Sequence, residues 1–335
     1  MSQIVVSNQF NPYLNIAVEN YLLSLPPDDG VTLYLWQNQR TVVIGQNQNP
    51  YAECNVEQLE KDGGYLMRRR TGGGAVFHDL GNLNFSFIVP NDLYDQARQF
   101  AVLQRAVAAY GLETEVSGRN DVLVVERAPN AAGGGRRSRK FSGNAFSKGR
   151  QQRLHHGTIL IHTDMKVLQH YLKVKPAKLQ KHGVASVQSR VVNLSELNPS
   201  ITADSIKPLM IEAFEQEYGA PLKTVEFDRL AQQPQVQELY RRFASPEWKY
   251  GNWLHFKAQR SAQFEWGGVE VSLEVDEASY TITSVAIASD SLFPDIICQA
   301  QQLLTGASTL QPPDISSLPS QNQQMLKDIF SLLYQ

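Results

Sequence analysis

The stretch Arg68-Arg-Arg-Thr-Gly-Gly-Gly-Ala-Val-Phe-His-Asp79 runs directly towards an alternating apolar segment, Asn84 to Val89. Three consecutive glycines remove every Cβ from one turn, so backbone N–H groups and guanidinium groups can approach a single anion. The spacing matches neither the Walker A loop nor the dinucleotide fingerprint. The stretch therefore predicts a phosphate or carboxylate site. The alternative is an ordinary glycine-rich hairpin turn with solvated arginines.

Two later segments repeat the combination of polar residues and small residues beside an apolar run. Ser117 to Asp121 leads into Val122 to Val125, which predicts a polar turn at the start of a buried strand. Lys140 precedes a Phe-Ser-Gly turn, and the pair His155-His156 precedes a Gly-Thr step. Each segment alone also fits ordinary turn chemistry or a solvated lysine.

Taken together and in this order, the segments resemble the catalytic domain of the lipoate-protein ligases, within the wider biotin and lipoate ligase fold. The residues that carry the resemblance are Arg69, Gly72 to Asp79, Gly81-Asn82, Gly118 to Asp121, Arg139-Lys140, Ser142-Gly143, His155 to Thr158 and Lys181 to Leu194. Further similar stretches near both ends, Asn11 to Glu19 and Phe264 to Gly268, extend the resemblance over nearly the whole chain.

The resemblance implies a two-step reaction. Lipoate and ATP give lipoyl adenylate and pyrophosphate, and the lipoyl group then passes to a lysine of a carrier domain. Bringing a carboxylate up to the α-phosphate requires positive charge and oriented N–H groups. The implied cofactors are ATP and Mg²⁺, with (R)-lipoate or octanoate as the acid. The implied partners are the carrier domains of 2-oxoacid dehydrogenase E2 subunits and the glycine cleavage H protein, without nucleic acid or membrane.

The resemblance also implies roles for individual residues. Lys140 corresponds to the catalytic lysine that contacts both the lipoyl carboxyl and the phosphate, and a compact ammonium suits a site shared by two ligands. The implied nucleotide-binding positions are Arg69, Gly73, Gly74, Ala75, Val76, Phe77, Asn120, Asp121 and Lys140. The implied lipoate-binding positions are Arg69, Gly74, His78, Lys140, Ser142, Gly143, His156 and Gly157. We expect His78 and His156 to line the pocket without a catalytic role.

Two further expectations concern a metal ion and a mobile loop. Asp121 is a candidate Mg²⁺ ligand, because hard carboxylate oxygens suit that ion. The charged stretch Lys173 to Val187 resembles the family's mobile adenylate-binding loop. Its candidate contact residues are Lys178, Lys181, Gly183 and Val184.

Composition bounds the class of protein without revealing its function. A chain of 335 residues with 42% hydrophobic content suggests two domains, and a net charge of −2 argues against a nucleic-acid binder. Cys54 and Cys298 are too few and too far apart for a disulfide framework or a metal site, which favours a reducing cytoplasm. No stretch approaches a membrane span or a signal peptide, so we expect a soluble cytoplasmic protein.

Periodicity gives a coarse secondary structure. An amphipathic helix is predicted over Leu14 to Leu22 and a second one over Gln99 to Tyr110, with Gly111 at its end. Thr32 to Trp36 and Thr41 to Ile44 are predicted to form a hairpin. Strands and helices mix without strict alternation, which predicts an α+β fold on a mixed, largely antiparallel sheet with flanking helices.

Composition changes at Ala244 to Gly251, which we interpret as a domain boundary. The expected division is a catalytic domain over residues 1–245 and a small α+β accessory domain over residues 246–335. Strands are predicted there at Ala262 to Trp266, Val269 to Val275 and Tyr280 to Ala288, before a helical tail. The low-complexity segment Ala128 to Arg139 predicts a flexible excursion with solvated arginines.

Other functions remain open at this stage. An ATP-independent octanoyl or lipoyl transferase of the same fold would need an activatable cysteine near the pocket lysine, and Cys54 and Cys298 lie outside the three segments. A non-catalytic lipoate-binding protein would keep the glycine turn but would not need Lys140. A biotin ligase fits less well, because Arg-Arg-Arg-Thr-Gly-Gly-Gly stands where a Gly-Arg-Gly-Arg type of loop is expected.

Overall fold

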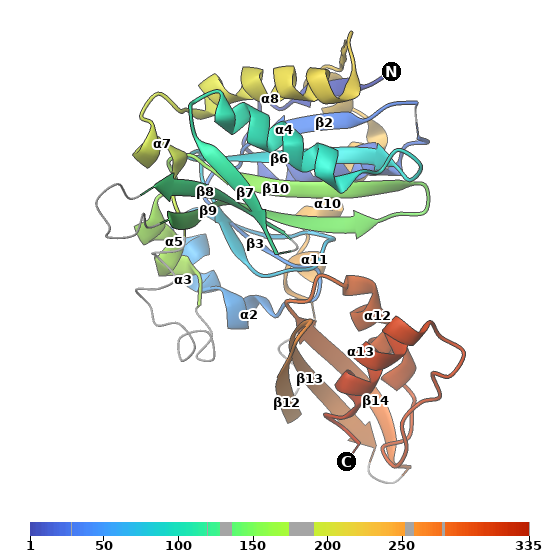
Figure 1. Ribbon diagram of the computed structural model, residues 1–335. Coiled ribbons are helices and arrows are strands. Elements are labelled where there is room, and N and C mark those ends of the chain that lie inside the picture. The colour runs from blue at the N-terminus through green and yellow to red at the C-terminus, as the bar shows by residue number, and fades with distance from the viewer. Residues whose placement is uncertain are drawn as a thin grey trace.

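A computed structural model describes residues 1–27, 29–118, 120–127, 136–173, 191–251, 258–276 and 279–334. Its centre is an eight-stranded mixed sheet with the order β11-β1-β2-β6-β10-β9-β8-β7 (Figure 1). The strands are β1 (Gln3–Val6), β2 (Thr32–Trp36), β6 (Asn82–Pro90), β7 (Glu113–Ser117), β8 (Asp121–Arg127), β9 (Arg136–Lys148), β10 (Gln152–Leu160) and β11 (Lys223–Thr224). β11, β1 and β2 run parallel, and every pair from β2 to β7 is antiparallel. The predicted α+β fold is confirmed.

Two helices, α4 (Gln96–Ala108) and α8 (Ala203–Tyr218), cover one face of this sheet (Figure 1). Each begins with a capping side chain, Asp95 for α4 and Thr202 for α8, which accepts from the free N–H groups of the first turn. Alternate residues of β6, including Phe85 and Phe87, point to this side and are fully buried. Burying one such side chain contributes about 1.5 to 3 kcal/mol, so this face is the main core.

The opposite face of the sheet packs against α1 (Pro12–Ser24), which begins at the cap Asn11. Three more helices pack beside α1, namely α9 (Phe227–Ala231), α10 (Pro234–Ala244) and α11 (Pro246–Tyr250). Trp248 of α11 donates from Nε1 to the carbonyl of Arg68 at 2.8 Å. The segment predicted as a domain boundary therefore begins with a helix that packs on the first part of the chain.

A second, three-stranded sheet lies beside α1 with the order β4-β3-β5. It consists of β3 (Thr41–Ile44), β4 (Tyr65–Arg68) and β5 (Val76–His78). Helices α2 (Pro50–Glu53), α3 (Val56–Lys61) and α5 (Met165–Tyr171) accompany it, and α7 (Leu194–Leu197) leads towards α8.

The predicted hairpin of β2 and β3 is wrong. β2 pairs with β1 and β6 in the large sheet, whereas β3 pairs with β4 and β5. The intervening Gln37 to Arg40 lacks the Asn-Gly or Asp-Gly pair that supports a tight hairpin. Both strands are buried along their whole length, so their apolar pattern does not show which neighbour they pair with.

The C-terminal part contains a separate antiparallel sheet, with β12 (Ala258–Phe264), β13 (Gly267–Asp276) and β14 (Thr281–Ser289). The helices α12 (Pro294–Leu304) and α13 (Ser320–Phe330) pack on it around their own core (Figure 1). The second and third predicted strands and the helical tail are confirmed, whereas the first strand ends at Phe264 and the predicted Trp266 lies in the turn to β13. The end of β14 contacts the first part of the chain, because Ser289 N donates to Asn47 O at 2.8 Å.

Two predicted flexible segments fall partly or wholly outside the described residues. Of the low-complexity segment, residues 128–135 lie outside, and the remainder opens β9. Arg136 pairs there with Glu115 at 2.9 Å but remains 57% exposed, as expected for a solvated arginine. Arg139 pairs with Glu126 at 2.5 Å and is only 15% exposed, so the expectation is wrong for Arg139. Beyond Lys173, the predicted adenylate-binding loop, with Lys178, Lys181, Gly183 and Val184, lies outside the described residues. No described helix is long and apolar enough to span a membrane.

Candidate active site

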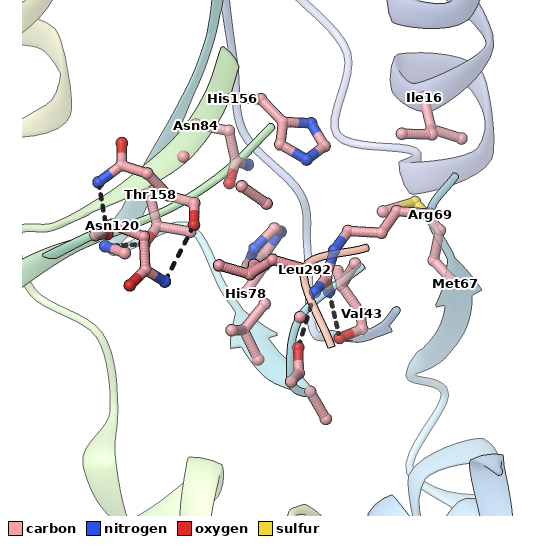
Figure 2. Close-up of a pocket in the computed structure, with 18 of the residues that line it drawn as sticks. Ile16, Val43, Met67, Arg69, His78, Asn84, Asn120, His156, Thr158 and Leu292 are labelled. Carbon is pink, nitrogen blue, oxygen red and sulfur yellow. Dashed lines mark hydrogen bonds between the residues drawn. The ribbon is translucent and has the colours of Figure 1, made fainter. Parts of the chain in front are cut away.

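A pocket of about 290 Å³ opens between the large sheet, the second sheet and the glycine turn. In Figure 2, Asn120 and Thr158 lie at one end, Ile16 and Met67 lie at the other, and His78 lies between them. The lining residues are Ile16, Trp36, Val43, Met67, Arg69, Gly73, Gly74, Ala75, Val76, His78, Asn84, Asn120, Lys140, Gly143, Asn144, Ala145, His156, Gly157, Thr158 and Leu292.

The strand register explains how the sheet supplies one wall of the pocket. Trp36, Asn84 and Thr158 are direct neighbours on β2, β6 and β10, so their side chains share one face. Phe85 alternates with Asn84 and points to the opposite face, into the main core. A single strand thus provides both the core under α4 and α8 and the polar wall of the pocket.

The glycine turn is shaped by close contact with the C-terminal part. Gly73 has φ +91°, a conformation that glycine adopts at little cost, and its N–H donates to Ser291 O at 2.8 Å. A Cβ on Gly72 would lie 2.0 Å from the same oxygen. Leu292, next in the chain, lines the pocket. The site therefore includes a residue from the C-terminal part.

Two of the three arginines serve the scaffold. Arg68 donates to five carbonyls, those of Gly45, Gln46, Gln48, Trp248 and Lys249, at 2.7 to 3.3 Å. Burial lowers the pKa of Arg68 to about 10. The initial expectation that all three guanidinium groups converge on one anion is therefore wrong, because Arg68 is occupied by carbonyls elsewhere.

Arg69 lines the pocket and also organises the glycine turn. Its Nη2 donates to Gly72 O at 2.7 Å and to Gly74 O at 2.9 Å, and its Nε donates to Thr71 Oγ1 at 3.0 Å. Burial lowers the pKa of Arg69 to about 10, against the opposing effect of Glu19. Arg69 remains charged at neutral pH and holds the loop carbonyls away from the pocket.

Lys140 enters the pocket from β9, at an irregularity in the pairing of β9 with β8. Leu123 pairs with Lys140 and Val122 with Ser142, so Phe141 is an extra residue, as in a β-bulge. Phe141 is fully buried in the main core, while the Lys140 ammonium reaches Asp121 Oδ1 at 2.7 Å. Both side chains are about one-third exposed, so this ion pair is open to exchange with solvent or ligands.

His78 is a neutral donor in the pocket wall. Burial, then electrostatic interactions with Arg69 and His156, lowers the pKa of His78 to about 3. The Nδ1 atom faces the donor Nδ2 of Asn38 at 3.2 Å, so the ring proton lies on Nε2, which has no partner in the described residues. Asn84 Nδ2 is also buried without such a partner. Buried unpaired donors are costly, which favours a site that receives ligand acceptors.

His155 and His156 point to opposite faces of β10. His155 is buried among Phe85, Phe87 and Phe100 in the main core, and burial lowers its pKa well below the usual range. His156 faces the pocket and bonds to Glu19 and Thr71, each at 2.8 Å. Only the second histidine is therefore placed to contact a ligand.

The structure brings most of the sequence-predicted site residues into one pocket. Those that line it are Arg69, Gly73, Gly74, Ala75, Val76, His78, Asn120, Lys140, Gly143, His156 and Gly157. Asp121 joins the site through Lys140, whereas Phe77 and Ser142 are buried away from the lining. Asp121 also belongs to no group of three or more metal-ligand side chains among the described residues.

The sequence reasoning missed most of the apolar end of the pocket. Ile16, Trp36, Val43 and Met67 lie in elements whose apolar patterns are equally consistent with plain core positions. Asn84 had a detectable signal, since it is a polar residue inside an apolar strand.

The two cysteines lie away from the pocket lining. Cys54 is 1% exposed in the core of the second sheet, and burial raises the pKa of its thiol to about 12. Cys298 lies beside Gln46 and Asn47 at the contact with the C-terminal part, and burial raises its pKa as well. Neither cysteine has the low pKa of a nucleophilic thiolate.

Comparisons with known proteins agree over nearly the whole chain. The model of the lipoyl protein ligase A/B catalytic domain matches residues 11–215, and that of the bacterial lipoate protein ligase C-terminus matches residues 254–331. A lipoate-protein ligase A of Psychrobacter cryohalolentis is 38% identical over 88% of this chain and 85% of its own length. One of Bdellovibrio bacteriovorus is 38% identical over 91% and 87%.

Solved structures show the same similarity. P. falciparum LipL1, solved with lipoate, has a TM-score of 0.80 at 28% identity and covers 99% of this chain and 98% of its own. A lipoate-protein ligase A bound with ATP has a TM-score of 0.57 at 25% identity, over 75% of this chain and 98% of its own.

Proposed function

The chain belongs to the lipoyl protein ligase A/B family, and from this premise we propose that it is an ATP-dependent lipoate-protein ligase. The enzyme activates lipoate as lipoyl adenylate and transfers the lipoyl group to a lysine of a carrier domain. The observation that carries the proposal is the position of Lys140, which lines the same pocket as the glycine turn and a set of apolar side chains, with its ammonium at 2.7 Å from Asp121.

The pocket suits an acid with a long apolar tail. Ile16, Trp36, Val43 and Met67 provide an apolar surface for the tail, and the carboxylate lies at Lys140. Asn120 contacts the nucleotide together with N–H groups of the glycine turn other than that of Gly73, which donates to Ser291 O. The ammonium then stabilises the negative charge that develops as the carboxylate oxygen attacks the α-phosphorus and pyrophosphate leaves.

Asp121 is the residue of this site that would hold Mg²⁺ together with the triphosphate oxygens. Its carboxylate is an oxygen ligand beside the pocket, and Mg²⁺ is commonly bound through one or two carboxylates plus phosphates. When bound, the ion would neutralise phosphate charge. Lys140, which pairs with Asp121 in the absence of ligands, would then turn to the acyl carboxylate.

The second step requires a lysine amine from a partner protein. One similar solved structure, at 26% identity and a TM-score of 0.60, comes from an archaeal lipoylation system described as a bipartite lipoate protein ligase and its E2 lipoyl domain from Thermoplasma acidophilum. We propose that lipoyl domains of E2 subunits and the glycine cleavage H protein are the partners here, in the cytoplasm. We also propose that residues 1–245 carry the catalysis, since every lining residue except Leu292 belongs to them.

The test is lipoate-dependent exchange of labelled pyrophosphate into ATP. A ligase catalyses this exchange without any carrier domain. Absence of exchange, with lipoyl or octanoyl transfer from an acyl carrier protein, would favour the transferase. Absence of both, with retained lipoate binding, would favour a binding protein.

A further inference from the structure

A buried series of hydrogen bonds connects the pocket wall with the buried face of α1. Glu19 is 1% exposed and does not line the pocket. Its Oε1 accepts from Ser86 Oγ at 2.5 Å and from His156 Nδ1 at 2.8 Å. On the other side of the ring, His156 Nε2 lies 2.8 Å from Thr71 Oγ1, which accepts from Arg69 Nε at 3.0 Å.

The direction of each hydrogen bond follows from the chemistry of the groups. The Nε of Arg69 can only donate, so Thr71 Oγ1 is its acceptor. A carboxylate oxygen can only accept, so His156 Nδ1 carries the ring proton and donates it to Glu19 Oε1. In this tautomer Nε2 is an acceptor and receives the hydroxyl proton of Thr71, whose oxygen accepts from Arg69 Nε. A carboxylate in α1 thus fixes the tautomer of a pocket histidine and the rotamer of a residue next to the glycine turn.

We propose that Glu19 is a positioning residue for the glycine turn, acting through His156 and Thr71 on Arg69. Arg69 in turn holds the carbonyls of Gly72 and Gly74. With an apolar residue in place of Glu19, Nδ1 loses its acceptor and the proton moves to Nε2. Nε2–H would then face Thr71 Oγ1, whose hydroxyl proton would have to rotate away from the ring and find another acceptor in a fully buried site.

Removing the Glu19 carboxylate also leaves Arg69 without the negative charge at the other end of this series of hydrogen bonds. Glu19 opposes the burial that lowers the pKa of Arg69. The buried guanidinium would then depend on carbonyl dipoles alone, and a buried charge that loses its compensation is destabilising. The glycine turn should lose its fixed geometry, although none of the residues that line the pocket has been substituted.

The consequence for catalysis rests on the proposed function, in which the turn contacts the nucleotide. Misplacement of such groups by about 1 Å commonly costs roughly a hundredfold in rate. We therefore expect Glu19→Leu to lower kcat/KM for ATP in pyrophosphate exchange by about 10- to 100-fold. Glu19→Gln should retain most of the activity, because its amide oxygen can accept from the same two donors.

The test combines this assay with ¹⁵N NMR of the histidine rings, which reports the tautomer of His156. The wild type and Glu19→Gln should show the Nδ1–H form and Glu19→Leu the Nε2–H form. Asn20→Ala is the matched control, since Asn20 is a buried neighbour on α1 whose side chain, among the described residues, hydrogen-bonds only to Ile16 O of its own helix. It should change neither readout.

Thr71→Val interrupts the same series of hydrogen bonds without altering α1. This variant replaces Glu19→Leu in the test if Glu19→Leu does not fold. It should reproduce the fall in kcat/KM, and adding Glu19→Gln should lower the rate little further. An unchanged His156 tautomer and rate in folded Glu19→Leu would overturn the inference, as would a normal rate in Thr71→Val. A fall in Glu19→Gln as large as in Glu19→Leu would also overturn it. If the wild type lacks exchange, the proposed function fails, whereas the tautomer measurement still tests the series of hydrogen bonds.

Discussion

Lys140→Ala should abolish lipoyl adenylate formation while leaving the fold intact. The lysine carries the only side-chain ammonium among the residues that line the described pocket, and it is placed where two anions must meet. Loss of one such donor to a transition state costs about 3 kcal/mol, which corresponds to roughly a 150-fold fall in rate. The effect on stability should be about 1 kcal/mol or less, because the ion pair with Asp121 is partly exposed.

Lipoate-dependent pyrophosphate exchange measures the first step directly, and urea unfolding measures the fold. Lys148→Ala is the matched control, since Lys148 lies exposed at the far end of the same strand. Lys140→Arg should stay slow, because a guanidinium fork does not replace a compact ammonium at a shared contact. Supplying preformed lipoyl adenylate should restore transfer by Lys140→Ala at least in part. Exchange within a few-fold of wild type by folded Lys140→Ala would refute the assigned role.

Three further predictions address the cysteines, the buried histidine and the glycine turn. Cys54→Ser and Cys298→Ser should each retain lipoate ligation, since both thiols lie outside the pocket and have raised pKa values. A folded but inactive Cys54→Ser protein would instead support the mechanism with a cysteine nucleophile. Because the pKa of His78 is about 3 in the folded protein and about 6.5 when unfolded, the unfolded state binds the proton more tightly and stability falls as pH drops below 6.5. This loss of unfolding free energy is about 2 kcal/mol at pH 5. The unfolding free energy of the wild type should therefore fall between pH 7 and pH 5 by about 2 kcal/mol more than that of His78→Gln. An equal fall in both proteins would contradict a buried neutral His78 ring. Gly73→Ala should destabilise the protein by about 1 to 3 kcal/mol in urea unfolding and weaken ATP binding, because Gly73 has φ +91°. Equal stability of the variant and the wild type would show that the turn can take another backbone conformation at no cost.

The sequence predicted those parts of the site where chemistry is local. The glycine turn was recognisable because three glycines stand beside three arginines, whereas Lys140 was assigned through the resemblance to the lipoate-protein ligases. The apolar end was not predictable in the same way, since Trp36 and Met67 follow the pattern of any buried strand. Leu292 could not be found locally, because its position depends on the contact of Ser291 with Gly73.

The pairing of β2 and β3 failed for a related reason. An apolar run shows that a strand is buried but leaves its neighbours unspecified, and the turn between the two strands has no residue that enforces a hairpin. The large sheet was nevertheless predictable as a class, because alternation in β6 separates a core face from a polar face. Fold class depends on such periodicity, whereas pairing depends on contacts between distant segments.

The cations of the glycine turn and of β9 illustrate why charge near a site does not by itself identify a ligand contact. Arg68 and Arg69 have planar groups with several donors, and backbone carbonyls of their own chain occupy those donors. A buried guanidinium needs these partners, since an unpaired one would be strongly destabilising. Lys140 instead has one exposed carboxylate partner at 2.7 Å, so a ligand anion can replace it without breaking the scaffold. Arg69 therefore fixes the shape of the turn, Arg68 connects the segment 45–48 to α11, and Lys140 is the cation that can exchange its partner during a reaction.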